Sequence, residues 1–592
     1  MTFDRATEVV GWGSGGAAWA QPAAPGVSRA LALALHAAGV REAFGVLGGG
    51  IAPFAAGLVS TPIRFHHFRH EAGAGFAAIE AHFATGRPGL AVVTTGPGLF
   101  NVLNPAMAAR VDGARLLVVS GFTAPALVGR GAVQETCLRT MPSELSRPGS
   151  IFHEVVLPEG EEELAHGLGR ILRGLAGPGG FVAHLGLSLP LQTRMLADPR
   201  RTSPVGAWSI DPPAPDEPTI DACLAALTDP SAAIWAGHGA RGASDLLRRF
   251  AERAGIPVLT SPRGKGVFPE SHPLFVGVSG AGGSPAVRAW FARCRPRHLL
   301  VVGTRLGEVT SFLSPDHTPG DGWTHVDLDP TAFGAAFGQV PGRGVVADAR
   351  RFFAALLARA EATGWFERRV VAPSLERAPP EPMTPRGDGP VRQPYLMQQL
   401  QAQVVKATDA IVMSEAGTSF TWCNAALRFD APGRYRTSAA WGSMGHFTTG
   451  CVGAALAGER RVVAVVGDGA MLMNNEINTA VQYGARVLWV ILNDAQLGLN
   501  EQGMTALGMR PVATQMPRTD FVAFARSQGA DGIAVEREDE LAAALASGLA
   551  HDGPFVLDVR VDRAIVSPVI ADRVRSLRGQ AGAPPSPIGV EP

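Results

Sequence analysis

Short apolar runs alternate with amphipathic stretches along most of this chain. In its first part, Leu90–Thr95 and Arg115–Ser120 have the length and composition of buried strands, and each is followed by Gly. Val27–Ala38 and Gly73–Ala84 have the apolar spacing of helices. Buried strands that alternate with helices are typical of a parallel, doubly wound α/β sheet. We therefore predict such a sheet from Gly26 onwards.

The same alternation returns twice, each time after a proline-rich break. The breaks are Pro199–Pro218 and Pro373–Pro394. Further strands are predicted at Ala232–Ala236, Pro257–Thr260, Leu299–Gly303, Thr324–Asp329, Ala410–Met413, Val462–Val466 and Val487–Leu492, with a helix at Gly242–Ala254. We expect three doubly wound parallel-sheet domains, at residues 26–197, 219–372 and 395–575. A flexible leader (1–25) and a C-terminal tail (576–592) would flank them.

Composition narrows the functional classes. The 592 residues leave room for several domains, and 46% of them are apolar, which excludes a disordered chain. Lys and Arg number 52, as do Asp and Glu, so the net charge of zero favours neither nucleic acid nor a membrane surface as a partner. No apolar run reaches the length of a membrane span, and the five cysteines form no CxxC pair. We expect a cytoplasmic enzyme.

The stretch from residue 461 to 500 carries the strongest chemical pattern. It predicts a strand, a tight turn, a helix with a left-handed cap, and a second strand that ends in two polar residues. These elements are Val462–Val466, Gly467-Asp468-Gly469, Met471–Tyr483 with Gly484, and Val487–Leu492 with Asn493-Asp494. Both polar clusters follow parallel strands, so Asp468 and Asp494 would reach one point. Two carboxylates and a backbone carbonyl suit Mg²⁺, and the glycines admit a diphosphate.

This arrangement resembles the signature of thiamine diphosphate (ThDP) enzymes. A GDG turn followed by an Asn-Asn-type pair is their mark, and the surrounding residues are similar to the acetolactate synthase, pyruvate oxidase and benzaldehyde lyase group. The resemblance implies pyrimidine-binding, central and diphosphate-binding domains in that order. It also implies that Asp468, Asp494 and the carbonyl of Gln496 hold Mg²⁺. Asp494 departs from the usual Asn and adds a negative charge. A GDG turn on its own is more often structural.

Glu71 is the candidate catalytic acid. Taken alone, it is an acid in the first turn of a helix, where the helix dipole favours it. His70–Ala74 and the TTGPGLFN segment at Thr94–Asn101, however, resemble the pyrimidine-binding domain of the family. The resemblance implies that Glu71 bonds N1′ of the aminopyrimidine and so activates the cofactor's own base for removal of the C2 proton.

Other cofactor contacts are expected in the last domain. Ser438–Gly453 looks like the family's G-x-M-G segment, which implies that the Gly442 carbonyl meets the 4′-amino group and that Met444 wedges beneath the cofactor. Core filling is the alternative role of Met444. The turn Gly417–Ser419 would contact the diphosphate. The cofactor-binding residues that we expect are Gly417, Thr418, Ser419, Gly442, Ser443, Met444, Gly467, Asp468, Gly469 and Ala470.

The type of reaction is predicted from two motifs of the first domain, a His pair that is absent and a Gln-containing segment that is present. Arg130–Thr136 has no His pair of the kind that simple decarboxylases carry, and it resembles the A-F-Q-E segment of acetolactate synthases, with Val133 for Phe and Gln134 retained. His66-His67 lies in a strand-like run and is interpreted as structural. These features favour carboligation, with Gln134 as a second catalytic residue. The alternatives are a decarboxylase or lyase that releases aldehyde and, with less support, a flavin oxidase.

The expected substrates are a small 2-oxo acid and a carbonyl acceptor. Gly303–Glu308 lacks the R-F-D-D-R sequence associated with flavin, so FAD is left open beside ThDP and Mg²⁺. Changes at Val133 and Thr418–Trp422 indicate a specialised relative, with Trp441 and His446 as candidate substrate contacts. The resemblance implies a homodimer at least, and commonly a homotetramer. A cofactor-binding but inactive subunit and a nucleotide-binding protein are the non-catalytic alternatives.

Overall fold

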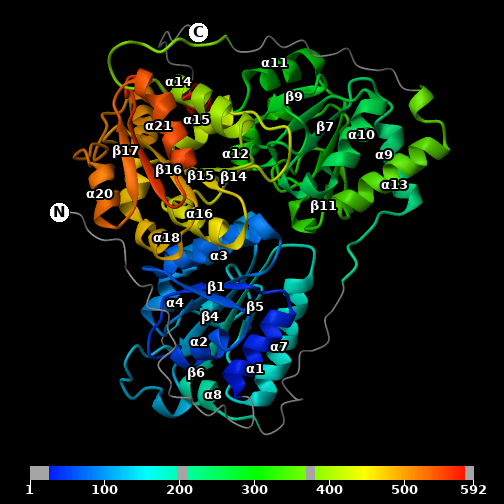
Figure 1. Cartoon of the computed structure of the whole chain (residues 1–592). Coiled ribbons are helices and arrows are strands. Elements are labelled where there is room, and N and C mark those ends of the chain that lie inside the picture. Colours follow the sequence, from blue (N-terminus) through cyan, green and yellow to red (C-terminus); the bar gives the residue numbers. More distant parts are fainter. Residues whose placement is uncertain (1–25, 140, 197–209, 369–380, 581–592) are drawn as a thin grey trace.

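The computed structural model describes residues 26–139, 141–196, 210–368 and 381–580, and it contains three α/β lobes (Figure 1). Each lobe is built on a parallel sheet of six strands. This confirms the predicted fold class. The expected leader, 1–25, lies outside the described residues.

The first lobe has the strand order β2-β1-β3-β4-β6-β5. Its strands are β1 (Glu42–Gly45), β2 (Arg64–His67), β3 (Gly89–Val93), β4 (Arg115–Phe122), β5 (Glu154–Val156) and β6 (Phe181–Ser188). Its helices are α1 (Val27–Ala37), α2 (Ala52–Val59), α3 (Glu71–Thr85), α4 (Pro97–Asn101), α5 (Leu103–Asp112), α6 (Ser143–Ser146), α7 (Glu161–Ala176) and α8 (Leu189–Thr193). The strands and helices predicted here are confirmed within a few residues at their ends.

The middle lobe has a different strand order, β12-β11-β10-β7-β8-β9. Its strands are β7 (Ala233–Ala236), β8 (Val258–Thr260), β9 (Phe275–Val278), β10 (His298–Val302), β11 (Gly322–Asp327) and β12 (Gly342–Val346). Its helices are α9 (Glu217–Ala226), α10 (Ser244–Ala254), α11 (Pro285–Cys294), α12 (Glu308–Ser311) and α13 (Ala349–Ala362).

The third lobe repeats the topology of the first, with the order β14-β13-β15-β16-β18-β17. Its strands are β13 (Ile411–Ser414), β14 (Tyr435–Thr437), β15 (Val462–Gly467), β16 (Val487–Asn493), β17 (Asp531–Val535) and β18 (Phe555–Arg560). Its helices are α14 (Gln393–Leu400), α15 (Thr418–Ala426), α16 (His446–Ala457), α17 (Asp468–Met473), α18 (Ile477–Tyr483), α19 (Gly498–Ala506), α20 (Phe521–Ser527), α21 (Glu538–Ala550) and α22 (Ile570–Gln580). Helix α22 thus includes the first residues of the expected tail.

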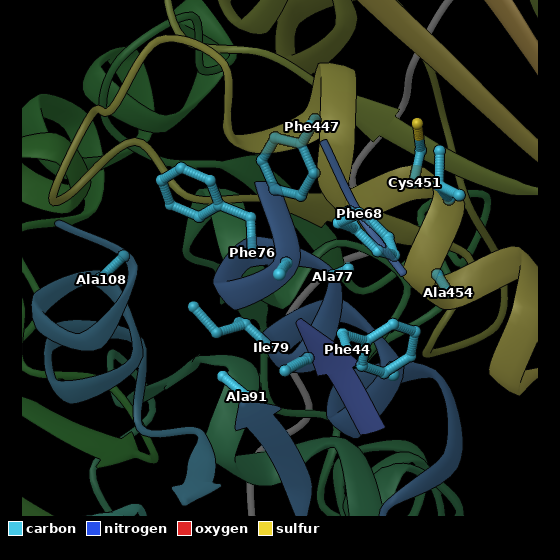
Figure 2. Packing of buried hydrophobic residues seen from close by; sticks show 14 of the residues in the cluster. Phe44, Phe68, Phe76, Ala77, Ile79, Ala91, Ala108, Phe447, Cys451 and Ala454 are labelled. Atoms are coloured by element: carbon cyan, nitrogen blue, oxygen red, sulfur yellow. The ribbon is translucent and has the colours of Figure 1, made fainter. Parts of the chain in front are cut away.

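Helices α3 and α16 join the first lobe to the third through small and aromatic side chains. Figure 2 shows Phe76 and Ala77 of α3 near Phe447 and Cys451 of α16, all of them buried. The helices approach so closely that a Cβ atom at Gly453 would lie 2.2 Å from the carbonyl oxygen of Ala77. Side chains of ordinary size would not fit at this contact. The two lobes therefore share one hydrophobic core.

A buried ion pair lies within the same contact. Arg436 of β14 donates two hydrogen bonds to the carboxylate of Glu80 on α3, at 2.9 and 2.6 Å. Burial alone would raise the pKa of Glu80, but the charge and hydrogen bonds of Arg436 and His446 together outweigh burial and hold that pKa at about 2. A paired and hydrogen-bonded buried charge is tolerated, whereas either partner alone is costly.

The helix predicted at Met471–Tyr483 is interrupted, so that prediction was wrong in part. Helix α17 ends at Met473, Asn474 is extended with φ −157°, and α18 begins at Ile477. Two contacts explain the break: the Asn474 carbonyl accepts a hydrogen bond from Thr448, and Glu476 accepts bonds from the first lobe. The left-handed cap at Gly484 is confirmed, with φ 63°.

None of the helices in the described ranges is long and apolar enough to cross a membrane.

Candidate cofactor and catalytic site

Three neighbouring strands of the third sheet end beside one another. β13 pairs with β15, and β15 pairs with β16, all in parallel. Gly417 follows β13, Asp468 follows β15 and Asp494 follows β16. In a sheet of this order, the junction between β13 and β15 is where the helices change faces, and ligands bind there at the carboxyl ends of the strands.

Asp468 and Asp494 form a buried pair of carboxylates at this edge. Asp468 accepts hydrogen bonds from the backbone N–H groups of Gly469 and Ala495, each at 2.7 Å. The Ala495 bond aims the Asp468 carboxylate at the end of β16. Burial and then the charge of Asp494 raise the pKa of Asp468 to about 7, and burial also raises the pKa of Asp494. A bound cation would relieve this repulsion, so the pair suits a metal ion.

The backbone at Gln496 supplies a further oxygen. Ala495 has φ 57°, and hydrogen bonds from Met516 to Ala495 and from Leu497 to Thr514 flank an antiparallel bridge between Gln496 and Gln515. In a pair flanked in this way, the N–H and C=O groups of the paired residues point away from the partner strand. The Gln496 carbonyl is therefore free to face a ligand.

The protein groups that could bind a metal ion here are all oxygens, and they are few: two carboxylates and one backbone carbonyl. In the part of the chain that the structure describes, no group of three or more His, Cys, Asp or Glu side chains could hold a metal ion. A cation here would thus take carbonyl, water or phosphate oxygens beside the two carboxylates. That is the usual environment of Mg²⁺ bound to a diphosphate, so the residues fit both groups.

An open cradle adjoins the carboxylates. A Cβ atom at Gly417, where φ is 107°, or at Gly467 would meet no atom within 4 Å. Thr418 and Ser419 begin helix α15 beside this space, and Gly469 and Ala470 lie in the first turn of α17. The Thr418 methyl group lies 3.5 Å from the Cβ position of Gly498, which itself lies 2.9 Å from Asp494 Oδ2. With the hydrogen bond from Ala495 to Asp468, these contacts bring the three strand ends together.

The segment around Met444 closes one side of the cradle. The Met444 methyl group lies 3.4 Å from the Cβ position of Gly469, so Met444 and the GDG turn are in contact. Gly442 has φ 71°. Ser443 Oγ and Trp441 Nε1 both donate to Asn104 Oδ1 of α5, at 2.7 and 2.8 Å. This segment therefore reaches the first lobe.

Glu71 is the first residue of α3 and is 9% exposed. Its Oε2 accepts a hydrogen bond of 2.9 Å from Nδ2 of Asn101, and its Oε1 lies 3.4 Å from the Cβ position of Gly98. Across residues 26–139, 141–196, 210–368 and 381–580, no hydrogen bond or ion pair joins Glu71 to the Asp468 group. Glu71 and the Asp468 group belong to different lobes, the first and the third.

Gln134 lies beside the TTGPG turn. Its backbone is left-handed, with φ 55°, and its Cβ lies 3.0 Å from the Cβ position of Gly96. Left-handed backbone is uncommon for a non-glycine residue and often marks a functional site. The adjacent Val133 is 91% exposed. Gln134 therefore stands at the same end of the first sheet as Glu71.

Of the two histidines discussed above, His66 has the expected structural position and His446 does not have the expected position at the substrate. His66 is buried and its Nε2 lies 2.7 Å from Glu42, which agrees with a structural role. His446 is 1% exposed, bonds Glu80 at 3.0 Å and stacks between Phe76 and Phe447. A substrate contact by His446 was therefore a wrong prediction. Trp441 is 41% exposed and stays a candidate.

Sequence reasoning missed three residues that hold the site together. Asn101 and Asn104 lie on α4 and α5 and bond Glu71 and the Met444 segment, and Glu476 bonds the backbone before Glu71. Asn101 ends the quoted TTGPGLFN segment, but nothing in the sequence pairs it with Glu71. The Asn-Asn-Glu run at residues 474–476 was the one signal for a helix break.

Comparison with known proteins places the chain in a family. Three domains of thiamine pyrophosphate enzymes match it: the N-terminal TPP binding domain at residues 26–141, the central domain at 224–356 and the C-terminal TPP binding domain at 415–559. The chain is 31% identical to the "Putative acetolactate synthase large subunit IlvB2" of Mycobacterium tuberculosis, over 85% of this chain and 91% of that protein.

Two further relatives have similar coverage. The chain is 29% identical to the "Putative thiamine pyrophosphate-containing protein YdaP" of Bacillus subtilis, over 88% of this chain and 89% of that protein. It is 27% identical to the acetolactate synthase isozyme 1 large subunit of Escherichia coli, over 89% and 92%. The chain therefore belongs to the thiamine pyrophosphate enzyme family, as an enzyme of the acetolactate synthase-like type that uses this cofactor.

Proposed function

We propose that this enzyme, with ThDP and Mg²⁺, decarboxylates a small 2-oxo acid and joins the remaining acyl unit to a second carbonyl compound. The product would be an acyloin or an acetohydroxy acid. The observation that carries the proposal is the convergence of three strand ends, which brings two buried carboxylates together beside the unfilled positions at Gly417 and Gly467.

The third lobe would hold the diphosphate and its metal ion. Asp468, Asp494 and the Gln496 carbonyl would bind Mg²⁺, while Gly417–Ser419 and Gly467–Ala470 would contact the phosphates. When bound, ThDP supplies a carbon nucleophile that adds to the ketone of the 2-oxo acid and accepts the electrons released with CO₂. Met444, which lies against the GDG turn, would orient the cofactor together with Gly442 and Ser443.

Glu71 would act on the pyrimidine ring. Its carboxylate is nearly buried and held by Asn101, so it can keep a fixed hydrogen bond to the ring nitrogen N1′. The chain carries both the N-terminal and the C-terminal TPP binding domains, and the resemblance to ThDP enzymes implies a site shared between two subunits. We therefore propose that each site uses Glu71 from one subunit and Asp468 from another. This requires a homodimer at least, and a homotetramer is compatible with it. We place the enzyme in the cytoplasm.

Carboligation is favoured over aldehyde release by the groups near Glu71. Gln134 can orient an acceptor through its amide, whereas His66 is bound to Glu42 and His446 to Glu80, so neither is placed to protonate a bound substrate. The exposed Val133 and the altered Thr418–Trp422 segment support a donor or acceptor other than those of a housekeeping acetolactate synthase. The proposal requires no flavin.

Product analysis with paired substrates tests this function. The purified enzyme would be incubated with Mg²⁺, ThDP and a panel of 2-oxo acids, each with and without a second carbonyl compound, and the mixtures analysed by mass spectrometry. We expect an acyloin or acetohydroxy acid whose yield rises with acceptor concentration and vanishes without ThDP. Free aldehyde as the sole product would favour a decarboxylase, and stoichiometric peroxide would favour a flavin oxidase.

A further inference from the structure

Glu476 binds the chain immediately before Glu71, although the two residues belong to different lobes. The Glu476 carboxylate accepts hydrogen bonds from the backbone N–H of Arg69, at 3.2 and 3.1 Å, and from that of His70, at 3.1 Å. His70 caps α3, and Glu71 is the first helical residue. One carboxylate therefore holds the two peptide groups that lead into the catalytic acid.

The carboxylate is itself held firmly in place. Glu476 is 1% exposed, and Thr479 of α18 donates a hydrogen bond to its Oε2. The first turn of α3 lies so close that a Cβ atom at Gly73 would stand 2.6 Å from Glu476 Oε1. Charge-assisted hydrogen bonds in a buried setting are strong and directional. A shift of Glu476 would therefore move the start of α3.

Other residues of α18 hold the same segment by different means. Asn478 and Gln482 accept hydrogen bonds from the Arg69 side chain, at 2.8 and 2.6 Å. The Tyr483 hydroxyl accepts a bond of 2.8 Å from the His67 N–H. In this segment Asn478 and Gln482 bond only the Arg69 side chain, so they can be changed without altering the backbone contacts before Glu71. Asn478 Nδ2 also donates a hydrogen bond of 3.4 Å to the Gln528 carbonyl, which lies outside that segment. They provide matched controls at the same interface.

We propose that Glu476 is a positioning residue that fixes the carboxylate of Glu71 for proton transfer on the cofactor. The inference rests on the proposed role of Glu71. Glu476 lies on the chain between α17, which begins at Asp468, and α18, so the third lobe sets the orientation of Glu71 in the first lobe. Misplacement of a catalytic group by about 1 Å can cost roughly 100-fold in rate. The interruption of the predicted helix thus has a functional consequence.

The test compares Glu476→Ala, Glu476→Gln, Asn478→Ala and Glu71→Gln. Amide hydrogen exchange of the peptide around residues 65–76 is measured in the cofactor-free protein, and exchange of the C2 proton of bound ThDP in the loaded enzyme. We expect Glu476→Ala to speed exchange of the Arg69 and His70 amides about tenfold or more. It should also slow C2 exchange roughly 100-fold, with ThDP affinity little changed. Glu476→Gln, which keeps one acceptor oxygen, should be intermediate, and Asn478→Ala should match wild type.

The outcomes separate this inference from the proposed function. Wild-type C2 exchange in Glu476→Ala, together with its loss in Glu71→Gln, would overturn the positioning role and leave that of Glu71 intact. Unchanged exchange in Glu71→Gln would instead overturn the proposed function. If Glu476→Ala fails to fold, the comparison of Glu476→Gln with Asn478→Ala decides. Equal rates of C2 proton exchange in these two variants would show that Glu476 has no effect beyond that of any other residue at the interface, and would refute the inference.

Discussion

Asp468 reaches from the end of β15 to the end of β16, where its Oδ2 accepts a hydrogen bond of 2.7 Å from the backbone N–H of Ala495. Ala495 directly follows Asp494, so this bond brings Asp468 next to Asp494. The bond thereby connects the ends of two neighbouring strands. The charge of Asp494 in turn contributes to the raised pKa of Asp468. A cation bound between the two carboxylates would relieve this repulsion.

Asp468→Ala should abolish Mg²⁺-dependent retention of ThDP, because the diphosphate then loses its bridging cation. Asp494→Asn should preserve binding, since the amide oxygen remains a ligand and the repulsion is removed. Isothermal titration of ThDP with and without Mg²⁺ distinguishes the variants. Unchanged Mg²⁺ dependence in Asp468→Ala would show that the metal binds elsewhere.

Glu71→Gln should leave ThDP bound but slow exchange of its C2 proton by more than the roughly 10²–10⁴-fold typical of one acid–base step, because every later step depends on that proton. The amide keeps the shape of the side chain and its contact with Asn101. NMR of the bound cofactor in deuterated buffer measures the exchange. A rate near that of wild type would remove Glu71 from the mechanism.

Glu80→Gln should destabilise the contact between the first and third lobes, because Arg436 is then buried without its partner carboxylate. Loss of one partner of a buried pair costs about 3–5 kcal/mol. The folded-state pKa of Glu80 is lowered to about 2, so its stabilising effect is complete above the ordinary Glu pKa of about 4.5 and is lost as the pH falls towards 2.

Thermal unfolding of wild type and Glu80→Gln from pH 7 to pH 3 measures this effect. The difference in melting temperature should be largest near pH 7 and shrink below about pH 4.5. A difference that is constant with pH would mean that Glu80 has the same pKa in the folded and the unfolded enzyme, which would contradict the lowered folded-state pKa.

Gly453→Ala should separate α16 from α3, because the new Cβ atom would lie 2.2 Å from the Ala77 carbonyl oxygen. Overpacking of this kind costs about 1–3 kcal/mol. Gly503→Ala on α19 is the control, because a Cβ atom there meets no atom within 4 Å and alanine favours helices. Equal melting temperatures for the two variants would contradict the close approach of α3 and α16.

The strands and the Gly467-Asp468-Gly469 turn could be predicted from sequence because their signals are local. Runs such as Val462–Val466 are apolar at every position, and a strand followed by Gly-Asp-Gly defines both an element and its end. Asp468 and Asp494 could be placed at one edge because parallel strands share their carboxyl ends. No long-range contact had to be known for these steps.

The contacts between lobes could not be predicted in the same way. The bond from Glu476 to the Arg69 and His70 backbone joins residues some 400 positions apart, and it overrides a helical pattern that is locally regular. His446 was misplaced for a similar reason. Its position beside the G-x-M-G segment suggested a substrate contact, but its ring lies in the buried α3–α16 interface with Glu80.

The fate of the acyl carbon decides between carboligation and aldehyde release. A 2-oxo acid labelled with ¹³C at its carbonyl carbon, and an acceptor labelled with ¹³C at its own carbonyl, would be incubated with the enzyme, ThDP and Mg²⁺ and followed by ¹³C NMR. We expect a one-bond ¹³C–¹³C coupling in the product, because the two carbonyl carbons become joined. Label found only in free aldehyde or in a carboxylic acid, across all acceptors that are tried, would contradict it.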